Sequence, residues 1–254
     1  MNNSKIYLSV IIPCYNEAEN IDKGMLLKVE QYLSKKNYAW EVLIVDDGST
    51  DGSYLKIKKF TEKKNNFHLI KNPHLGKAYA ILTGMNKASG GYILFTDLDQ
   101  ATPITEVEKM LKFVPQYDIV VGSRKNKRKG APFLRLMMAR GFMFLRGCIL
   151  GLGDVFDTQC GFKLFKGEII SRLTPKLNIY RSLQNRETIK GSHVSAGFDV
   201  EILFIAKKLK FKIKEVPVRW EYVDTRRVNP ILDSVEGLLD LLKIRINEWK
   251  GAYK

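Results

Sequence analysis

Short apolar runs alternate with helix-length amphipathic segments through the first half of this chain. The apolar, β-rich runs cover residues 8–13, 41–45, 67–70, 92–96 and 119–121. The segments between them with a helical pattern cover residues 21–33, 54–60, 78–88 and 104–114. Strands separated by helices in this way form βα units. The sequence therefore predicts an α/β fold with a mostly parallel sheet flanked by helices.

Clusters of polar residues follow four of these apolar runs, at 14–17, 46–49, 72–77 and 97–99. In an open parallel sheet, ligands bind outside the carboxyl ends of the strands. Because all four clusters come after a predicted strand, we expect them to meet at one edge of the sheet and to form a single site.

Two carboxylates, Asp97 and Asp99, stand two positions apart where an apolar run ends. Alternate side chains of an extended segment point the same way, so this pair could hold Mg²⁺ or Mn²⁺ together with phosphate oxygens. The alternative is an ordinary turn before a helix, since Thr102 and Pro103 are typical of a helix start.

Two further positions indicate a nucleotide site. Asp46 ends a predicted strand and could accept hydrogen bonds from a base or ribose, whereas Asp47 and Gly48 suit a tight turn. Gly76 and Lys77 begin a helix, where backbone N–H groups and an ammonium can bind phosphate. The full P-loop pattern is absent, which disfavours ATPase chemistry.

The 254 residues and the 45% hydrophobic content allow a sizeable core. We expect one domain over residues 1–228, with a long loop at 174–196, and an amphipathic C-terminal helix within 229–254. Three cysteines without a close pair and three scattered histidines argue against a disulfide framework and a zinc site. Together with an N-terminus unlike a signal peptide, they favour the cytoplasm.

The formal net charge of +15 predicts anionic partners. The charge is concentrated between Asp118 and Asp154, an interval without acidic residues that includes Arg146. Arginines alternate there with bulky apolar residues, and no charge-free stretch reaches the ~20 residues that cross a bilayer. The segment 124–153 could lie in a membrane interface as a basic amphipathic helix, or pack on the sheet as an ordinary helix.

Four segments in order resemble one known family. They are LSVIIPCYNE at 8–17, VDDGSTDG at 45–52, DLD at 97–99 and DTQCGFK at 157–163. This set is similar to the family 2 inverting glycosyltransferases of the GT-A fold, and within it to the enzymes that make polyprenyl-phosphate or dolichyl-phosphate glucose or mannose. The similarity runs from about residue 8 to 230.

The resemblance implies roles on the donor side. A nucleotide sugar would be bound by Pro13, Tyr15, Glu17, Asp46 and Lys77, with Asp46 facing the base. Asp97 would contact the donor, and Asp99 would ligate the Mg²⁺ or Mn²⁺ that bridges its diphosphate. A late basic residue, Arg227 or its neighbour Arg226, would clamp the phosphates.

It implies roles on the acceptor side as well. The lipid phosphate would be held by Ser123, Arg124, Arg135 and Arg140. Asp157, Gln159, Asp199 and Glu201 would line the sugar and the acceptor. An acceptor phosphate is largely dianionic at neutral pH and needs no strong base. Asp157 and Asp199 are therefore expected to orient groups, and the role of general base stays open for both.

Three positions depart from the family pattern. Relatives have a glutamine two places after the second aspartate as a metal ligand, but this chain has Ala101 there. Gln100, one place earlier, is the candidate for a further metal ligand beside Asp99 and Asp97. The usual tryptophan before the Asp199 motif is replaced by Ser-Ala-Gly at 195–197, and two adjacent arginines obscure which one clamps the donor.

The function expected is metal-dependent transfer of a hexose, glucose from UDP-glucose, to a polyprenyl phosphate at the cytoplasmic surface of an anionic membrane. One alternative is a family 2 enzyme that uses another nucleotide sugar, such as GDP-mannose, or a glycan or protein hydroxyl acceptor. Two non-catalytic alternatives are a sugar-nucleotide sensor and a nucleic-acid-binding module. The acidic sheet edge argues against nucleic acid as a partner.

Overall fold

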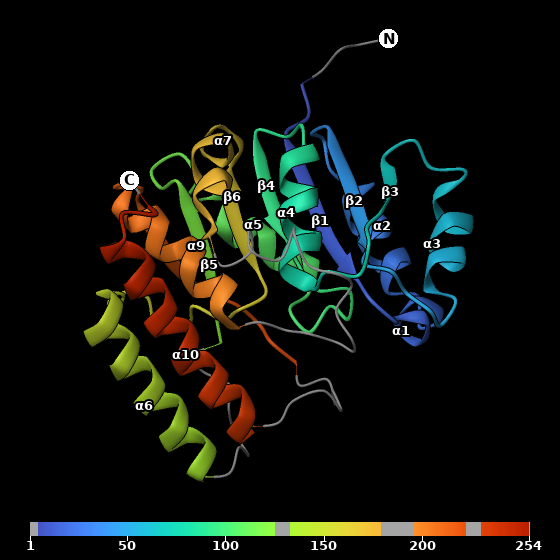
Figure 1. Cartoon of the computed structure of the whole chain (residues 1–254). Helices are drawn as coiled ribbons and strands as arrows, with labels where there is room; N and C mark the ends of the chain where they lie inside the picture. Colours follow the sequence, from blue (N-terminus) through green and yellow to red (C-terminus); the bar gives the residue numbers. More distant parts are fainter. Residues whose placement is uncertain (1–4, 125–132, 179–195, 222–229, 254) are drawn as a thin grey trace.

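The computed structural model describes residues 5–124, 133–178, 196–221 and 230–253, with the backbone alone at 133–140, 196 and 230–234. A seven-stranded sheet forms the centre, in the order β3-β2-β1-β4-β6-β5-β7 (Figure 1). The strands are β1 (Leu8–Cys14), β2 (Trp40–Asp46), β3 (Phe67–Lys71), β4 (Tyr92–Phe95), β5 (Ile119–Ser123), β6 (Lys163–Lys166) and β7 (Ile213–Pro217). The α-helices are α1 (Ala18–Asp22), α2 (Met25–Leu33), α3 (Ser53–Thr61), α4 (Lys77–Lys87), α5 (Val107–Leu111), α6 (Phe133–Leu150), α7 (Ile170–Leu173), α9 (Ala196–Lys208) and α10 (Pro230–Trp249). Short 3-10 turns are η1 (Ile104–Glu106), η2 (Gly167–Ile169) and η3 (Thr174–Lys176).

The sheet is mostly parallel, as predicted. Strands β1 to β4 are mutually parallel, and β5 is parallel to β7. Strand β6 alone runs antiparallel, between β4 and β5, and its first residue Lys163 pairs with Phe95 at the end of β4. Neither β6 nor β7 was expected from the sequence, because both are short and contain lysines.

The core lies on both faces of the sheet. Ile11 and Ile93 pack on one face with residues of α4 and α9, whereas Val10 and Leu94 pack on the other with α2 and α5. This division follows from the alternation of side chains along a strand. Each such side chain, fully buried, contributes about 1.5–3 kcal/mol to folding, so the apolar runs of the sequence became the central strands.

Two predicted helices are divided in the structure. The segment 21–33 contains the end of α1 and the whole of α2, separated at Gly24, whose φ of 75° is left-handed. Such a conformation interrupts a right-handed helix and suits glycine. The segment 104–114 begins as η1 and continues as α5.

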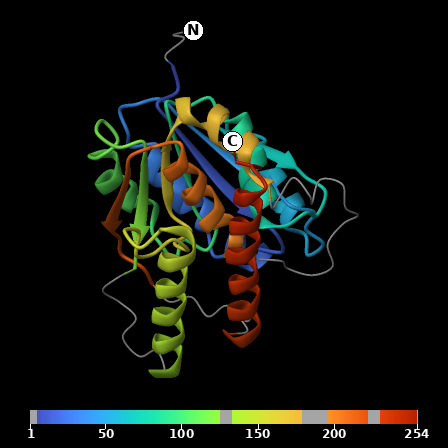
Figure 2. The same cartoon turned by 60° about the vertical axis from the view of Figure 1, so that its left-hand side comes forward.

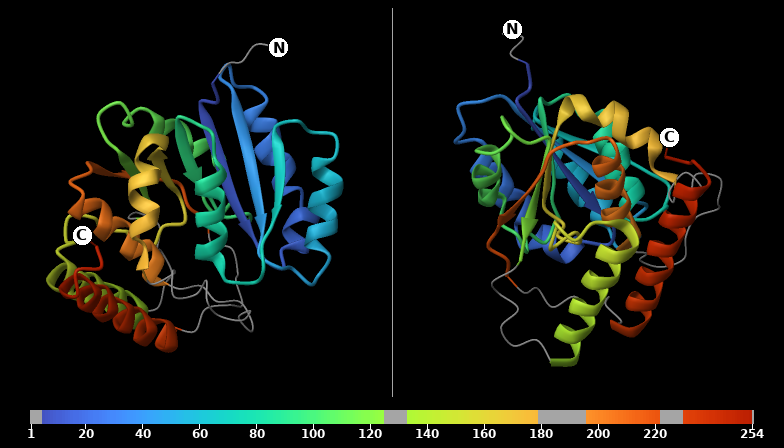
Figure 3. Two further views of the ribbon diagram at one scale, coloured as in Figure 1. Left: turned by 45° about the horizontal axis from the view of Figure 1, so that its top comes forward. Right: turned by 90° about the vertical axis from the view of Figure 1, so that its left-hand side faces the viewer.

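Helices α6 and α10 lie side by side and extend past the carboxyl ends of the parallel strands (Figures 1 and 2). The left view of Figure 3 shows the pair away from the strands β1 to β3. The helices approach closely, because a Cβ at Gly237 would lie 3.0 Å from the Phe142 ring. The predicted C-terminal amphipathic helix is thus present as α10. In the described part of the chain, no helix combines the length and the apolarity needed to span a bilayer.

Three predictions fall partly or wholly outside the described residues. Most of the predicted loop at 174–196 does so, since only its start, with η3, is described. Arg226 and Arg227 lie in one of the gaps, and the side chains of Arg135 and Arg140 are among those not described.

Candidate active site

The polar clusters predicted to share a site come together at the carboxyl edge of the sheet. Strands β2, β1 and β4 are neighbours, and Cys14 at the end of β1 is in register with Asp46 at the end of β2. The segment that follows β4 carries Asp97 and Asp99 beside them. Adjacent parallel strands therefore bring residues from three separate parts of the sequence to one place.

Asp46 ends β2 with an unsatisfied acceptor. Asp46 is only 1% exposed. Its Oδ2 accepts a hydrogen bond from the backbone N–H of Ser49 at 3.3 Å, whereas Oδ1 has no partner among the described residues. A buried acceptor without a donor is costly. A ligand N–H at this position would satisfy it.

An aromatic pair lies at the ends of β1 and β3. The rings of Tyr15 and His74 are stacked, with centroids 4.0 Å apart and planes 10° apart. Of the other predicted donor-site residues, Pro13 is buried within β1, and Oε2 of Glu17 accepts a hydrogen bond from the side-chain Nδ2 of Asn20 at 2.5 Å. Tyr15, Glu17 and Asp46 thus occupy one end of the sheet edge, as expected.

Asp47 binds the loop before α4 at this end of the sheet edge. From the sequence, Asp47 was expected in a turn, and these contacts were not predicted. Its carboxylate accepts hydrogen bonds from the Leu75 and Gly76 amides at 3.0 and 2.8 Å, and Nδ1 of His74 lies 2.8 Å from Oδ2. Burial raises the pKa of Asp47, and the hydrogen bonds from this loop oppose the rise. The carboxylate therefore joins the end of β2 to the start of α4.

Lys77, the first residue of α4, contacts Asp97. Its Nζ lies 2.5 Å from Asp97 Oδ1. Burial opposes the charged form of Lys77, but the carboxylates of Asp97 and Asp199 outweigh it and raise the pKa of the ammonium. On the other side of Asp97, a Cβ at Gly161 would lie 2.3 Å from Oδ2, so the carboxylate rests against a glycine.

Asp99 differs from its neighbours because it has no cation partner among the residues that the structure describes. Its Oδ1 accepts a hydrogen bond from the Ala101 amide at 3.0 Å, and it forms no ion pair with any described residue. Burial and then the charge of Asp97 raise the pKa of Asp99 above its ordinary value. A divalent cation beside these two carboxylates would remove this electrostatic penalty, so the residues fit Mg²⁺ or Mn²⁺.

Gln100 was predicted as a further metal ligand, and its geometry does not favour that role. The residue has a left-handed φ of 53°. Its Nε2 donates to the Asp97 carbonyl at 2.9 Å, and its Oε1 accepts from the Ile104 amide at 3.0 Å. Both polar atoms of the side chain hold the turn. Within the described residues no three Asp, Glu, His or Cys side chains converge on one metal position, so a cation here would take its remaining ligands from substrate or water.

Arg124 and Asp157, both predicted on the acceptor side, bind each other. Nε and Nη2 of Arg124 donate to the two oxygens of Asp157 at 2.8 and 2.7 Å, and the Arg124 amide adds a bond at 2.9 Å. Burial works against the charged guanidinium, yet Asp157 outweighs it and raises the pKa of Arg124. The adjacent Ser123 is 1% exposed, and its hydroxyl has no partner among the described residues.

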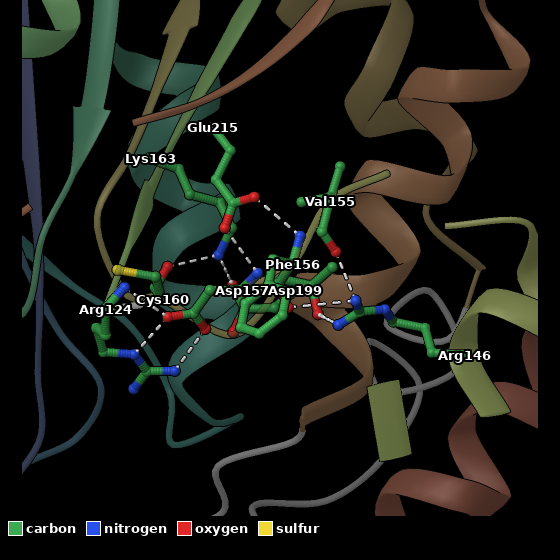
Figure 4. A network of polar contacts seen from close by, with 10 residues as sticks. Arg124, Arg146, Val155, Phe156, Asp157, Cys160, Lys163, Asp199 and Glu215 are labelled. Atoms are coloured by element: carbon green, nitrogen blue, oxygen red, sulfur yellow. Dashed lines mark hydrogen bonds and ion pairs between the residues drawn. The ribbon is translucent and has the colours of Figure 1, made fainter. Parts of the chain in front are cut away.

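Asp199 pairs with Lys163, a residue that the sequence interpretation quoted in a motif but did not select. The Lys163 side chain is 0% exposed, and its ammonium binds an oxygen of Asp199 and the Cys160 carbonyl, the latter at 2.7 Å (Figure 4). A lysine is almost never fully buried without a partner. Its place between the apolar residues Phe162 and Leu164 was the available signal.

Glu201 was predicted to line the acceptor side, but its described contacts lie on the other side of α9 from Asp199. Two residues along a helix correspond to 200° of rotation, so Asp199 and Glu201 leave α9 in opposite directions. The buried Oε1 of Glu201 accepts hydrogen bonds from the Asn178 amide at 2.9 Å and the Tyr253 hydroxyl at 2.7 Å. Glu201 thus binds Tyr253 near the C-terminal end of α10, while Gln159, also predicted to line the acceptor side, is exposed.

Comparison with known proteins places the chain in a family. The sequence model for Glycosyl transferase family 2 matches residues 9–174. The chain is 34% identical to a dolichyl-phosphate beta-glucosyltransferase from Dictyostelium discoideum, over 98% of this chain and 77% of that protein. It is 32% identical to the Saccharomyces cerevisiae protein of the same name, over 100% of this chain and 78% of that one.

A solved structure of similar fold is the glucosyl-3-phosphoglycerate synthase of Mycobacterium tuberculosis in complex with Mn²⁺, UDP and glucosyl-3-phosphoglycerate. Its TM-score is 0.62 at 15% identity, and the match covers 94% of this chain and 80% of that one. This likeness confirms the predicted GT-A fold. With the family match over most of the chain and two relatives above 30% identity, the protein is an enzyme that belongs to the family 2 glycosyltransferases.

Proposed function

We propose that this glycosyltransferase moves a hexose, glucose in the first instance, from a nucleotide sugar to a polyprenyl phosphate with inversion at the anomeric carbon. The names of the two relatives support glucose as the sugar and dolichyl phosphate as the acceptor. The observation that carries the proposal is the charge arrangement at the sheet edge. Asp97, Asp157 and Asp199 each contact a cation, whereas Asp99 contacts none of the described ones.

On the donor side, the unsatisfied Oδ1 of Asp46 would accept the ring N–H of a uracil, beside the stacked Tyr15 and His74. Asp97 and Asp99 would hold Mg²⁺ or Mn²⁺ together with the diphosphate. The cation would stabilise the negative charge that builds on the leaving group. Lys77 lies close enough to Asp97 to contribute a further positive charge, and Arg226 or Arg227 would complete the donor site.

On the acceptor side, the nucleophile would be the phosphate itself, which is mostly dianionic near pH 7. Neither Asp157 nor Asp199 is free to act as its base. Both oxygens of Asp157 accept hydrogen bonds from Arg124, and Asp199 contacts Lys163. We therefore assign Asp157 the task of orienting Arg124 toward the acceptor phosphate, with Ser123, Arg135 and Arg140 as further candidates for binding it.

The acceptor is a lipid, so the site would work at a membrane surface. Exposed apolar side chains gather on the two helices that extend past the sheet edge. Phe144 on α6 is 71% exposed and Trp249 on α10 is 77% exposed. Four further exposed apolar residues on α10 are Val235, Leu239, Leu242 and Ile246. We propose that this face, with Arg135 and Arg140 of α6, lies against the cytoplasmic surface of an anionic membrane.

The direct test is incubation of the full chain with radiolabelled UDP-glucose, Mn²⁺ or Mg²⁺, and dolichyl phosphate in anionic lipid vesicles. We expect label in the organic extract, dependent on the metal and lost with a chelator. Parallel reactions with GDP-mannose and with undecaprenyl phosphate would define donor and acceptor. Absence of a lipid-linked sugar with every common nucleotide sugar, while a hydroxyl acceptor is glycosylated, would replace this proposal with the glycan or protein acceptor.

A further inference from the structure

Arg146 is a buried arginine of the basic segment 124–153, among the side chains of that segment that the structure describes. The two residues before it on α6, Phe144 and Leu145, are 71% and 40% exposed, whereas Arg146 is 3% exposed. Its side chain leaves α6 toward the segment 155–158, which carries Asp157 (Figure 4). One turn of this helix therefore has an apolar outer face and a guanidinium on its inner face.

The guanidinium binds the acceptor-side segment through oxygen atoms. Nη1 donates to the Thr158 hydroxyl at 2.7 Å, and Nη2 donates to the carbonyls of Val155 and Phe156 at 2.5 and 3.3 Å. Three acceptors on consecutive parts of one loop meet a rigid, planar donor. The contacts fix the loop in position as well as in orientation.

Glu215, on the edge strand β7, holds the same segment by its amides. Its Oε2 accepts a hydrogen bond from Phe156 and its Oε1 accepts one from Asp157, both at 3.0 Å. Arg146 thus binds carbonyls and Glu215 binds N–H groups of adjacent residues. Arg146 and Glu215 together fix the position of the backbone around Asp157. The Asp157 carboxylate in turn accepts three hydrogen bonds from Arg124.

Stability alone does not account for Arg146. It forms no ion pair within the described part of the chain, and its Nε has no partner there. Burial lowers the pKa of Arg146, and the more distant charges of Asp157, Glu215 and Asp154 oppose the shift. A well-packed apolar side chain is often at least as stabilising as a buried ion. What the guanidinium supplies is a defined position for the loop.

We propose that Arg146 and Glu215 are positioning residues that set Asp157, and through it Arg124, for binding of the acceptor phosphate. The inference rests on the proposed function, because it assigns the phosphate of the acceptor to Arg124. It links α6 to the acceptor half of the site by a continuous set of hydrogen bonds, from Arg146 through the loop to Asp157 and Arg124.

The test compares Arg146→Met, Arg146→Lys and Glu215→Gln in the full chain, with Arg172→Met as the matched control. Arg172 is an exposed arginine of α7 whose guanidinium lies 5.0 Å from the centroid of the Phe211 ring. The measurements are steady-state kinetics with varied UDP-glucose and varied dolichyl phosphate, and hydrogen exchange of the peptide that contains residues 155–160.

For Arg146→Met, displacement of the loop predicts a KM for dolichyl phosphate raised about tenfold or more, with the KM for UDP-glucose within about twofold of the wild type. Lysine keeps the charge but cannot reach all three acceptors, so Arg146→Lys should recover part of the loss. Glu215→Gln replaces one accepting oxygen with a donor, and should reproduce the selective effect. All three should raise exchange at 155–160, and Arg172→Met should change nothing.

An equal rise in the KM for UDP-glucose and the KM for dolichyl phosphate would overturn the proposal. Unchanged hydrogen exchange at residues 155–160 in folded variants would overturn it as well. If Arg146→Met does not fold, Arg146→Lys and Glu215→Gln decide the question. Failure of the wild type to glucosylate any polyprenyl phosphate would count against the proposed function instead, and the exchange data would still show whether Arg146 holds the loop.

Discussion

The donor and acceptor halves of the site are built in opposite electrostatic states. On the donor half and among the described residues, Oδ1 of Asp46 has no hydrogen-bond donor and Asp99 has no cation partner. On the acceptor half, Asp157 and Asp199 are already bound to Arg124 and Lys163. The difference teaches what each half receives. A half with unpaired anions suits a cation and a base N–H, whereas a half with pre-oriented cations suits an anion.

The largest effect is expected from Asp99→Asn, which removes the charge that a metal would balance and keeps a similar shape. Metal-dependent turnover should fall by about 10³-fold or more. The metal-free variant should unfold at a temperature no lower than the metal-free wild type. Burial and the charge of Asp97 raise the pKa of Asp99 in the wild type, so the Asp99 charge is unfavourable in the folded state. Kinetics, calorimetric Mn²⁺ titration and thermal unfolding measure the three quantities.

The control for this variant is Asp22→Asn, at an exposed aspartate paired with Lys56 at 2.7 Å. It should keep wild-type turnover and Mn²⁺ affinity. Wild-type turnover by the Asp99→Asn protein would remove the contrast between the two halves.

The pair of Lys163 and Asp199 should show an asymmetric loss of stability. Asp199→Asn leaves a fully buried ammonium without its counter-charge, at a cost of about 3–5 kcal/mol. Lys163→Met leaves a carboxylate whose side chain is 20% exposed, which water can reach, so the cost should be about 1–2 kcal/mol. Urea denaturation measures both values, and the double variant should lose less than their sum.

The reverse order, with Lys163→Met the more damaging, would mean that Asp199 rather than Lys163 carries the penalty. In that case the acceptor half would resemble the donor half in holding an unbalanced anion.

Gly161→Ala tests where the two halves touch. The new Cβ would lie 2.3 Å from Asp97 Oδ2, so the carboxylate must move, and turnover should fall by about 10²-fold. Gly141→Ala on α6 is the matched control, because a Cβ there meets nothing within 4 Å. That change should leave turnover intact and add about 0.5–1 kcal/mol of stability. Equal turnover in the two variants would show that the position of Asp97 is not critical.

The smallest effect is expected from Asp157→Asn. This variant distinguishes two roles for the Asp157 carboxylate, orientation of Arg124 and general-base catalysis. Loss of a base should reduce kcat by about 10²–10⁴-fold. An orienting role predicts a decrease of about tenfold in kcat/KM for the lipid acceptor, with donor affinity unchanged. Steady-state kinetics with each substrate varied distinguishes the two, and a large loss of kcat would assign the base to Asp157.

The donor half was largely predictable from sequence, because its residues lie at the ends of apolar runs that form adjacent strands. The sheet edge follows from local pattern and a general rule of parallel sheets. The turn at Asp47 was the exception. Its hydrogen bonds go to residues 28 and 29 positions later, which no local pattern shows.

The acceptor half was less predictable, for reasons that the pairs make clear. Arg124 and Asp157 are 33 positions apart, and Lys163 and Asp199 are 36 apart. Each was recognised as polar, but a sequence does not state which polar groups neutralise each other. Arg146 was grouped with the other arginines of the basic segment 124–153, and charged side chains normally lie on the surface. Glu201 could have been placed correctly by counting 200° from Asp199 on the helix.

The reversed direction of β6 has a consequence for how such an enzyme can change over evolution. Donor residues follow the ends of parallel strands, whereas the segment from Asp157 to Gly161 precedes the start of an antiparallel one. Insertions or replacements before Gly161, the residue of this segment that lies against Asp97, leave the crossovers between β1, β2 and β4 untouched. The fold is therefore modular: a new acceptor specificity can arise between β5 and β6 while the nucleotide-sugar site is inherited whole.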